Sequence, residues 1–486
     1  MSKRLIFILA LVFVASMVAG AYAEVQNVKV SGDILMRAIS RENFTLSKAV
    51  KYKDAGFTTT TRVRIDADLT DNVSTTVRLL NERSWGLENN WNGAGIADTD
   101  KTTTVDVDLA FVTLKEFLYS PLTLTIGRQE LKFGNGLIIG DPDTVLYADE
   151  TGVPMDLSSR KAFDAIRATL NYDPLIIDLV YAKIDETNGS WWQQMGTTEN
   201  DDVNLWGVNA LYNLGMNNAT AEVYYWKRVN KDKDATTVLS PEMLSKNDTC
   251  NTFGFLVQGE VLPKTLKASV EYARQYGTET TYLNNNIGYN AKRRAWATQA
   301  MLTYLYQDQP ALGAIYTYLS GDNDVYAGKA KGWDPMFTGQ IGNNVVSAIL
   351  PASDVQIINL WGGMKPSEDV TISLVYGYYR LVKEMQDLAN GAFLAFGDYA
   401  RLLGVAPYGP TAFGGGNYYA MTGKKSLGNA IDLTATYDYT EDVQFGLTFG
   451  MMFLGDAFRK SSGAITGIQP NHENPRQLIG SMKVTF

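Results

Sequence analysis

Short segments in which apolar and polar residues alternate recur along almost the whole chain. In segment 61–69 the two faces separate cleanly into apolar Val63, Ile65, Ala67 and Leu69 and polar Arg62, Arg64, Asp66 and Asp68. A period of two residues indicates a β-strand with one apolar and one polar face. Eighteen such strands are predicted, at 28–39, 59–69, 73–82, 104–114, 122–130, 163–172, 175–185, 202–213, 219–228, 252–262, 266–276, 294–306, 311–320, 355–365, 370–382, 428–439, 443–454 and 477–486.

The connections between these segments alternate strictly between short and long. The short ones carry Asp, Asn, Pro or Gly, which favour turns, and lie at 70–72, 115–121, 173–174, 214–218, 263–265, 307–310, 366–369 and 440–442. The long ones include 83–103, 131–162, 321–354 and 383–427. A β-sandwich has no reason to keep this order, whereas short periplasmic turns and long extracellular loops are typical of an outer-membrane barrel. We therefore predict one all-β, antiparallel transmembrane barrel of about eighteen strands over residues 24–486, in the bacterial outer membrane.

The first 23 residues have the pattern of a secretory signal peptide. Lys3 and Arg4 precede an apolar stretch, and Ala21-Tyr22-Ala23 supplies the small residues of a cleavage site. No run of eighteen apolar residues follows, so no helical membrane span is expected. Because the signal holds two basic residues and no acid, its removal changes the formal net charge from −9 to −11. That acidic balance argues against nucleic acid as a partner, and the single cysteine, Cys250, excludes an internal disulfide.

The charged faces of the strands must point into the barrel. In hydrocarbon an unpaired backbone group costs several kcal/mol, so the first and last strands should pair and close the sheet. Eighteen strands enclose a lumen too wide for side chains alone to fill. A Lys or Arg facing lipid at the bilayer midplane would cost about 2–4 kcal/mol. Strand parity then predicts these pore-lining residues: Arg62, Arg64, Asp66, Asp68, Arg78, Asp106, Asp108, Arg128, Arg167, Glu222, Lys267, Glu271, Arg380 and Asp432.

Two interpretations of these charges remain open. In the first, the arginines of neighbouring strands form a basic ladder for anionic solutes, made of Arg62, Arg64, Arg78, Arg128 and Arg167. In the second, each is a wall charge paired with one of the nearby acids, Asp66, Asp68, Asp106 and Asp108. Arg128 joins either set only if a β-bulge lies near Gly127, because its parity otherwise matches that of Ile126.

The last segment ends on an aromatic residue. Leu478, Gly480, Met482, Val484 and Phe486 share one face of the predicted strand, and Phe486 closes the sequence. A terminal aromatic residue after an alternating strand resembles the signal read by the barrel-assembly machinery, which is therefore an expected partner.

Several short motifs resemble the alginate-export family of outer-membrane porins. They are Gly127-Arg128-Gln129-Glu130 with Phe133-Gly134-Asn135-Gly136, Phe163-Asp164-Ala165-Ile166-Arg167, Tyr318-Leu319-Ser320-Gly321-Asp322, Leu427-Gly428-Asn429-Ala430-Ile431-Asp432-Leu433 and Phe453-Leu454-Gly455-Asp456-Ala457-Phe458. The resemblance covers most of the chain after the signal and implies an eighteen-stranded barrel. It also implies passage of an anionic uronate polymer, such as alginate, through an arginine-lined pore, with Arg62, Arg64, Arg128 and Arg167 as the family-like arginines.

The function expected from the sequence is a channel for hydrophilic solutes, with anionic solutes among them, by passive diffusion. An alternative is a structural or adhesive barrel whose long loops bind a partner. A hydrolase is less favoured, because a Ser-His site needs a positioned base and His472 is the only histidine. Acidic residues in two loops (Asp141, Asp143, Asp149 and Glu150; Asp322 and Asp324) lack EF-hand spacing. No metal site, cofactor or catalytic residue is predicted.

Overall fold

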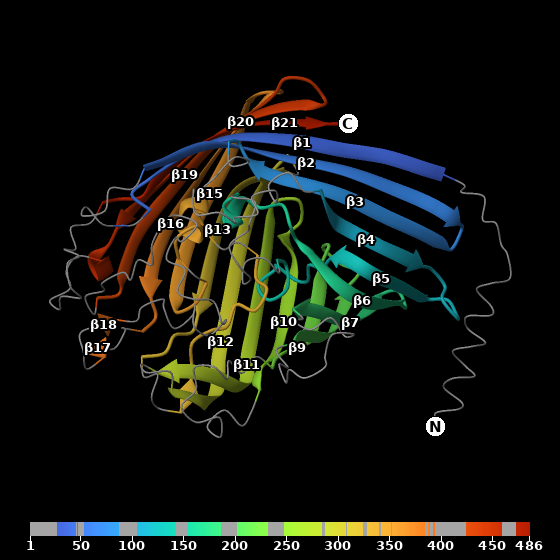
Figure 1. Ribbon diagram of the computed structural model, residues 1–486, viewed down its shortest axis with the longest axis horizontal. Helices are drawn as coiled ribbons and strands as arrows, with labels where there is room; N and C mark the ends of the chain where they lie inside the picture. Colours follow the sequence, from blue (N-terminus) through green and yellow to red (C-terminus); the bar gives the residue numbers. More distant parts are fainter. Residues whose placement is uncertain are drawn as a thin grey trace, which may run out of the picture.

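The structure, a computed structural model, consists almost entirely of antiparallel strands that pair with their neighbours in sequence (Figure 1). It describes residues 27–44, 46, 53–86, 105–141, 153–185, 202–231, 247–283, 287–307, 309–323, 328–339, 342–350, 352–383, 387–388, 392–393, 424–458 and 473–486. The predicted signal 1–23, His472 and most of the loop 383–427 lie outside these described residues. Within the described ranges there is no helix with the length and hydropathy of a membrane span.

Eighteen of the described strands make the barrel wall, which confirms the predicted architecture. They are β1 (Asn27–Glu42), β2 (Lys53–Thr70), β3 (Val73–Ser84), β4 (Asp106–Leu114), β5 (Leu122–Glu130), β6 (Ala162–Asn171), β7 (Leu175–Asp185), β8 (Val203–Asn213), β9 (Thr220–Asn230), β10 (Asp248–Leu262), β11 (Leu266–Leu283), β12 (Ile287–Tyr306), β13 (Gln309–Leu319), β15 (Val355–Ser367), β16 (Val370–Leu381), β19 (Ser426–Asp438), β20 (Val443–Leu454) and β21 (Arg476–Thr485).

The first and last strands pair and close the sheet. The β1–β21 ladder runs from Asp33 opposite Thr485 to Glu42 opposite Arg476. Beyond it, Gly32 and Phe486 exchange both backbone hydrogen bonds, at 2.8 and 3.0 Å. Closure gives the backbone groups of both edges partners inside the protein, which a sheet needs in order to sit in lipid.

Alternation along the strands sets an apolar outer face against a polar inner one. On β12, Trp296, Leu302 and Tyr304 are exposed on the outer face, while Arg293 of β12 and Glu271 and Gln275 of β11 are buried on the inner face. The strands β11 and β12 also continue well past their predicted limits of 276 and 294, and only residues 284–286 separate them. Thr278 continues the outer face of β11 beyond Tyr276, because outer-face residues beyond the hydrocarbon need not be apolar.

A β-bulge changes the faces of β4. Arg78 pairs with Leu109 and Leu79 with Val107, so Asp108 is an extra residue in the ladder. The predicted inward positions of Asp106 and Asp108 imply by parity that Val107 and Leu109 both face lipid, and for Leu109 this is wrong: Leu109 is buried, whereas Val107 is half exposed. An extra residue in one strand shifts the inward–outward alternation by one position for the residues that follow it, so Asp108 and Leu109 are both buried although they are adjacent in sequence.

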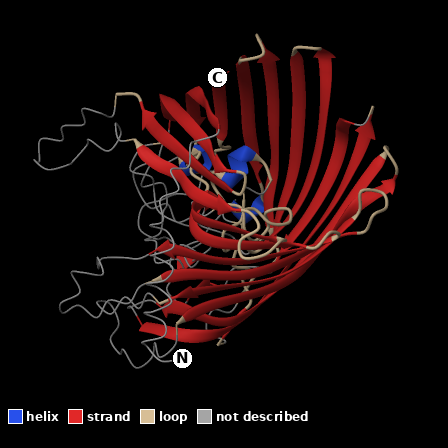
Figure 2. Cartoon of the chain, turned by 90° about the vertical axis from the view of Figure 1, so that its right-hand side faces the viewer, coloured by secondary structure: helices blue, strands red, loops and turns tan. Residues whose placement is uncertain are grey.

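Part of the chain folds back inside the wall. We call segments 131–141, 153–161, 328–339 and 342–350 the inner layer; Figure 2 shows its short helical turns within the barrel. It contains η4 (Met155–Leu157) and α2 (Asn344–Ser347). At its start, segment 328–339 still pairs with β12 in the wall sheet as β14 (Lys329–Ala330), and η6 (Asp456–Phe458) follows β20. A short pair, β17 (Asp387–Leu388) and β18 (Ala392–Phe393), forms a separate sheet. The inner layer carries much of the buried apolar cluster, including Leu137, Ile139, Trp333 and Phe337.

Candidate functional site

The inner faces of β1, β2 and β3 carry ion-paired side chains that stay open to the lumen. Arg62 makes two hydrogen bonds to Asp33, at 2.9 and 3.0 Å. Arg64 makes two to Asp66, at 2.8 and 2.9 Å, and the Thr76 hydroxyl donates to the same carboxylate at 2.6 Å. The side chains of Arg62, Arg64 and Asp66 keep 24%, 41% and 35% of their surface exposed. This sector of the wall therefore presents bidentate arginine–carboxylate pairs to water.

Deeper pairs join the same sector to the inner layer. Arg78 contacts both Asp108 and Glu130 at 2.5 Å. Asp106 accepts a hydrogen bond at 2.5 Å from Arg160, which belongs to the inner layer. The predicted residues Arg78, Asp106 and Asp108 thus lie close together, and Glu130 joins them although the sequence prediction omitted it.

Arg167 lies on the inner face of β6. Its guanidinium donates to Asp178 at 2.7 Å and lies 5.2 Å from the centre of the Phe133 ring. Phe133 belongs to the inner layer and packs on Trp226 of the wall. A cation over an aromatic face is a favourable contact, so Arg167 both lines the lumen and supports the inner layer.

Three further predicted lining residues, like Arg78 and Asp108, face inward but are buried. Glu222 accepts a hydrogen bond from the backbone N–H of Gly134 at 3.1 Å, and Glu271 one from Asn135 at 3.4 Å. Asp432 accepts one at 2.6 Å from the N–H of Asn344, at the start of α2. All three carboxylates are buried. Their predicted contact with solute is therefore corrected: they hold the inner layer against the wall. Strand parity predicted that these three side chains face inward. It could not predict their burial, because the inner-layer segments that cover them have no regular alternation in sequence.

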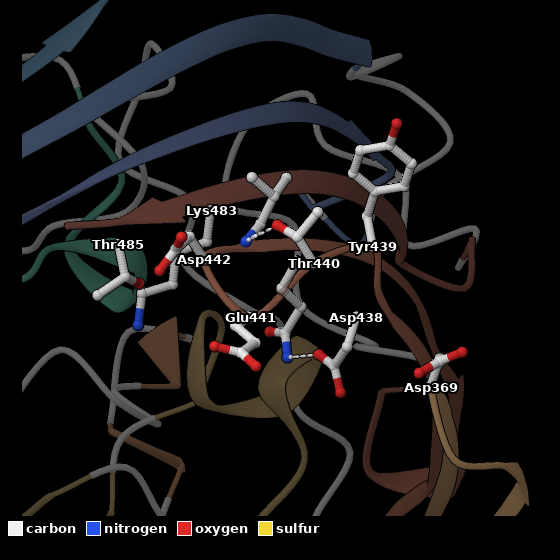
Figure 3. Close-up of a pocket in the computed structure, with 10 residues that line it drawn as sticks. Asp369, Asp438, Tyr439, Thr440, Glu441, Asp442, Lys483 and Thr485 are labelled. Carbon is white, nitrogen blue, oxygen red and sulfur yellow. Dashed lines mark hydrogen bonds between the residues drawn. The ribbon is translucent and has the colours of Figure 1, made fainter.

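Asp68 and Lys267 lie at the short-turn end of the barrel. Asp68 is exposed opposite Ser74, and Lys267 is 4.0 Å from Glu260 with half of its side chain exposed. A cavity of about 610 Å³ opens at this end, at the turns between β15 and β16 and between β19 and β20 (Figure 3). It is lined by Asp369, Asp438, Tyr439, Thr440, Glu441, Asp442, Val443, Gln444, Lys483 and Thr485.

Two predicted lining residues lie on the outer face instead. The β5–β6 ladder runs without a shift, so Arg128 lies opposite Asp164, two residues beyond the exposed pair Ile126 and Ile166. Arg128 forms its ion pair there, 3.1 Å from Asp164. Gly127 does have a φ of 121°, and a Cβ would lie 2.1 Å from the Ala110 carbonyl oxygen, but no bulge accompanies it.

Arg380 is the second of these. It shares the face of Tyr376 and Leu374, which are exposed, while Tyr379 and Leu381 on the other face are buried. Arg380 sits near the loop end of β16, where an outward charge lies outside the hydrocarbon and costs little. The predicted inward position of Arg380 is therefore wrong.

A buried ionic cluster was missed by the sequence prediction. Arg228 donates to Asp334 at 2.6 and 3.0 Å, and Arg293 lies 2.9 Å from Glu279, 3.1 Å from Asp334 and 3.2 Å from Asp248. Burial by itself raises the pKa of Asp334, but the two guanidinium groups outweigh it and the net direction is down. Because Asp334 belongs to the inner layer, this cluster ties segment 328–339 to β9–β12. Arg293 fell just before a predicted strand, so its parity was not considered.

Of the six acidic loop residues considered in the sequence, the structure describes Asp141 and Asp322. Asp141 pairs with Lys161, and Asp322 accepts a hydrogen bond from the N–H of Lys331 at 2.9 Å. The other four lie outside the described ranges. In the described part of the chain, no group of three or more metal-binding side chains occurs. Near Asp322, burial raises the pKa of Asp354 to about 7, although the N–H of Lys383 donates to it.

A family model described as alginate export matches residues 27–467, which include every strand of the wall except β21. The chain belongs to the alginate export family. This confirms the resemblance found in the sequence. An alginate-export barrel is a passive channel of the bacterial outer membrane, surrounded by membrane lipid, and this is the function and location of the chain.

Solved structures share the fold of this alginate-export barrel. OccK8 (OprE) of Pseudomonas aeruginosa superposes with a TM-score of 0.51 at 10% identity, over 95% of this chain and 99% of that one. OccAB4 of Acinetobacter baumannii gives 0.51 at 11% identity, over 96% and 100%. OccK11 (OpdR) of Pseudomonas aeruginosa gives 0.50 at 11%, over 95% and 97%. No curated protein sequence matches the chain.

Proposed function

We propose that this channel passes small hydrophilic solutes, anionic ones included, along the open inner wall of β1–β3 and β6, and that it catalyses no reaction. The observation that carries the proposal is the pairing of the lumen arginines. Each of the following contacts at least one carboxylate: Arg41, Arg62, Arg64, Arg78, Arg160 and Arg167. Such a wall is polar but nearly balanced in charge. It supports the wall-charge interpretation over an uncompensated basic ladder.

The test is the reversal potential of the purified protein in a planar bilayer across a KCl gradient. We expect an open channel whose reversal potential stays close to zero, because paired charges favour neither ion strongly. A strongly cation-selective channel would contradict passage of anionic solutes. A barrel that never conducts would favour the adhesive alternative instead.

A second candidate substrate is a uronate polymer such as alginate, which the family membership favours. Among the inner-wall arginines, Arg64 is the most open and could contact carboxylates of a passing chain. Alginate oligomers added to one side of the same bilayer distinguish the candidates. A concentration-dependent reduction of the current by the oligomers supports the polymer, and an unchanged current supports small solutes alone.

We also propose that Phe486 is read by the barrel-assembly machinery. Its side chain is 58% exposed, while its backbone is held by Gly32, so the ring is accessible without breaking the barrel. Phe486→Ser should lower the amount of heat-modifiable barrel in the outer membrane several-fold. Phe445→Ser, the same change at another exposed phenylalanine near this end, is the control. Equal loss in both variants, or failure of Phe486→Ser to refold in detergent, would point to lost stability rather than lost recognition.

A further inference from the structure

The outer face of β12 changes from apolar to basic at a defined level. Trp296, Leu302 and Tyr304 occupy exposed outer-face positions, with one aromatic residue towards each end. This spacing fits an apolar band of about 25 Å flanked by aromatic girdles. Arg294 and Lys292 are the next two outer-face residues beyond Trp296, and both are exposed. They therefore lie just outside the hydrocarbon, on the side of the long loops.

Two neighbouring elements add positive charge close to this level. Arg274 lies opposite Trp296 in the β11–β12 ladder, two residue pairs below the Tyr276–Arg294 pair and so one outer-face position nearer the apolar band. Lys329 of β14 lies beside Lys292 in a parallel pairing, and both are exposed while the next pair, Arg293 and Ala330, is buried. Diagonal neighbours on one face of a sheet are about 7–8 Å apart. We call Arg274, Lys292, Arg294 and Lys329 the outer basic patch.

The outer basic patch has no counter-charge among the described residues. None of its four side chains forms an ion pair with a described carboxylate, and Glu279, Asp248 and Asp334 of the same region are buried on the inner side around Arg293. The lumen side differs, since Arg41, Arg62, Arg64, Arg78 and Arg167 each contact a carboxylate there. A cluster of exposed cations left unpaired at a membrane boundary favours an external anion.

We propose that the outer basic patch binds the phosphate groups of a phosphorylated glycolipid in the outer leaflet. Guanidinium groups match phosphate oxygens in bidentate geometry, and ammonium groups add point charge. The level of the patch selects a lipid over a dissolved anion. Acyl chains would lie along Leu302 and Trp296 while the phosphates meet Arg294 and Arg274, so that apolar contact and charge act together.

The test compares two variants in neutral detergent micelles, titrated with bisphosphorylated lipid A. The first replaces the patch by Arg274→Gln, Lys292→Gln, Arg294→Gln and Lys329→Gln. The matched control removes four exposed lysines at the short-turn end, by Lys29→Gln, Lys115→Gln, Lys264→Gln and Lys365→Gln. Because each cation near an anionic lipid surface contributes measurably, the patch variant should bind roughly tenfold more weakly or worse. The control should bind like the unaltered protein.

Three further readings decide the proposal. Dephosphorylated lipid A should bind the unaltered protein as weakly as lipid A binds the patch variant, and inorganic phosphate at the lipid's concentration should not compete. Equal binding of both variants overturns the proposal. So does full competition by inorganic phosphate, which would indicate a site for a free anion. Heat-modifiability and channel conductance, measured on both variants, show that the barrel is intact.

Discussion

Arg293→Met is expected to increase the channel's conductance and to destabilise the protein by about 3–5 kcal/mol, the usual cost of breaking a buried ion pair by removing one partner. Arg293 is 2% exposed and lies against Glu279, Asp248 and Asp334. Without it, Asp334 and Asp248 keep the guanidinium of Arg228, and Glu279 loses the ion-pair partner that it has among the described residues. The least costly relief is for segment 328–339, which carries Asp334, to leave the wall and widen the lumen.

Conductance in planar bilayers and urea unfolding in liposomes measure the two effects. Arg380→Met, the same change at an exposed outer-face position, is the control and should alter neither. Asp334→Asn should act in the same direction more mildly, because it keeps the shape and leaves both arginines with acidic partners. An Arg293→Met channel with unchanged conductance would show that the cluster does not hold the inner layer in place.

Asp33→Asn combined with Asp66→Asn is expected to make the channel clearly anion-selective. The two changes leave Arg62 and Arg64 without their carboxylate partners while preserving side-chain size. Both arginines already face water, so their uncompensated charge would act directly on permeating ions. The reversal potential in a KCl gradient should shift towards that of chloride, and high salt should reduce the shift by screening.

The matched control is Asp71→Asn with Asp173→Asn, which removes the same charge from two exposed short turns. It should leave the reversal potential near that of the unaltered protein. If both double variants shift it equally, the selectivity reflects total charge, and Arg62 and Arg64 do not set it.

Alternation predicted the wall well because lipid imposes it. Wherever a strand crosses hydrocarbon, an outward charge is costly, so the faces of Arg62, Arg64, Asp66 and Arg167 follow from parity. The same rule fails at the rim. Arg380 stands outward without penalty there, and assigning every charge to the lumen placed it on the wrong side.

The inner layer could not be predicted in the same way. Its backbone N–H groups donate hydrogen bonds to wall carboxylates that are distant in sequence, from Asn135 to Glu271 and from Asn344 to Asp432. No local period records such a match. The wall residues did contain one indication of the inner layer. A buried carboxylate needs a hydrogen-bond donor, and some inward acids, such as Glu222, have no neighbouring arginine on the wall. Their donor therefore had to come from another segment of the chain.

The anchoring of the inner layer also orders the steps of folding. The bond from Gly134 to Glu222 spans 88 residues, that from Asn135 to Glu271 spans 136, and the Thr338 hydroxyl bonds to Gly136 across 202. Closing such loops in an unfolded chain carries a large entropic cost before any contact repays it. Pairing of successive strands shortens these distances one hairpin at a time. We therefore expect the wall to form before the inner layer packs against it, so that a newly closed barrel would have a wider lumen than the mature channel.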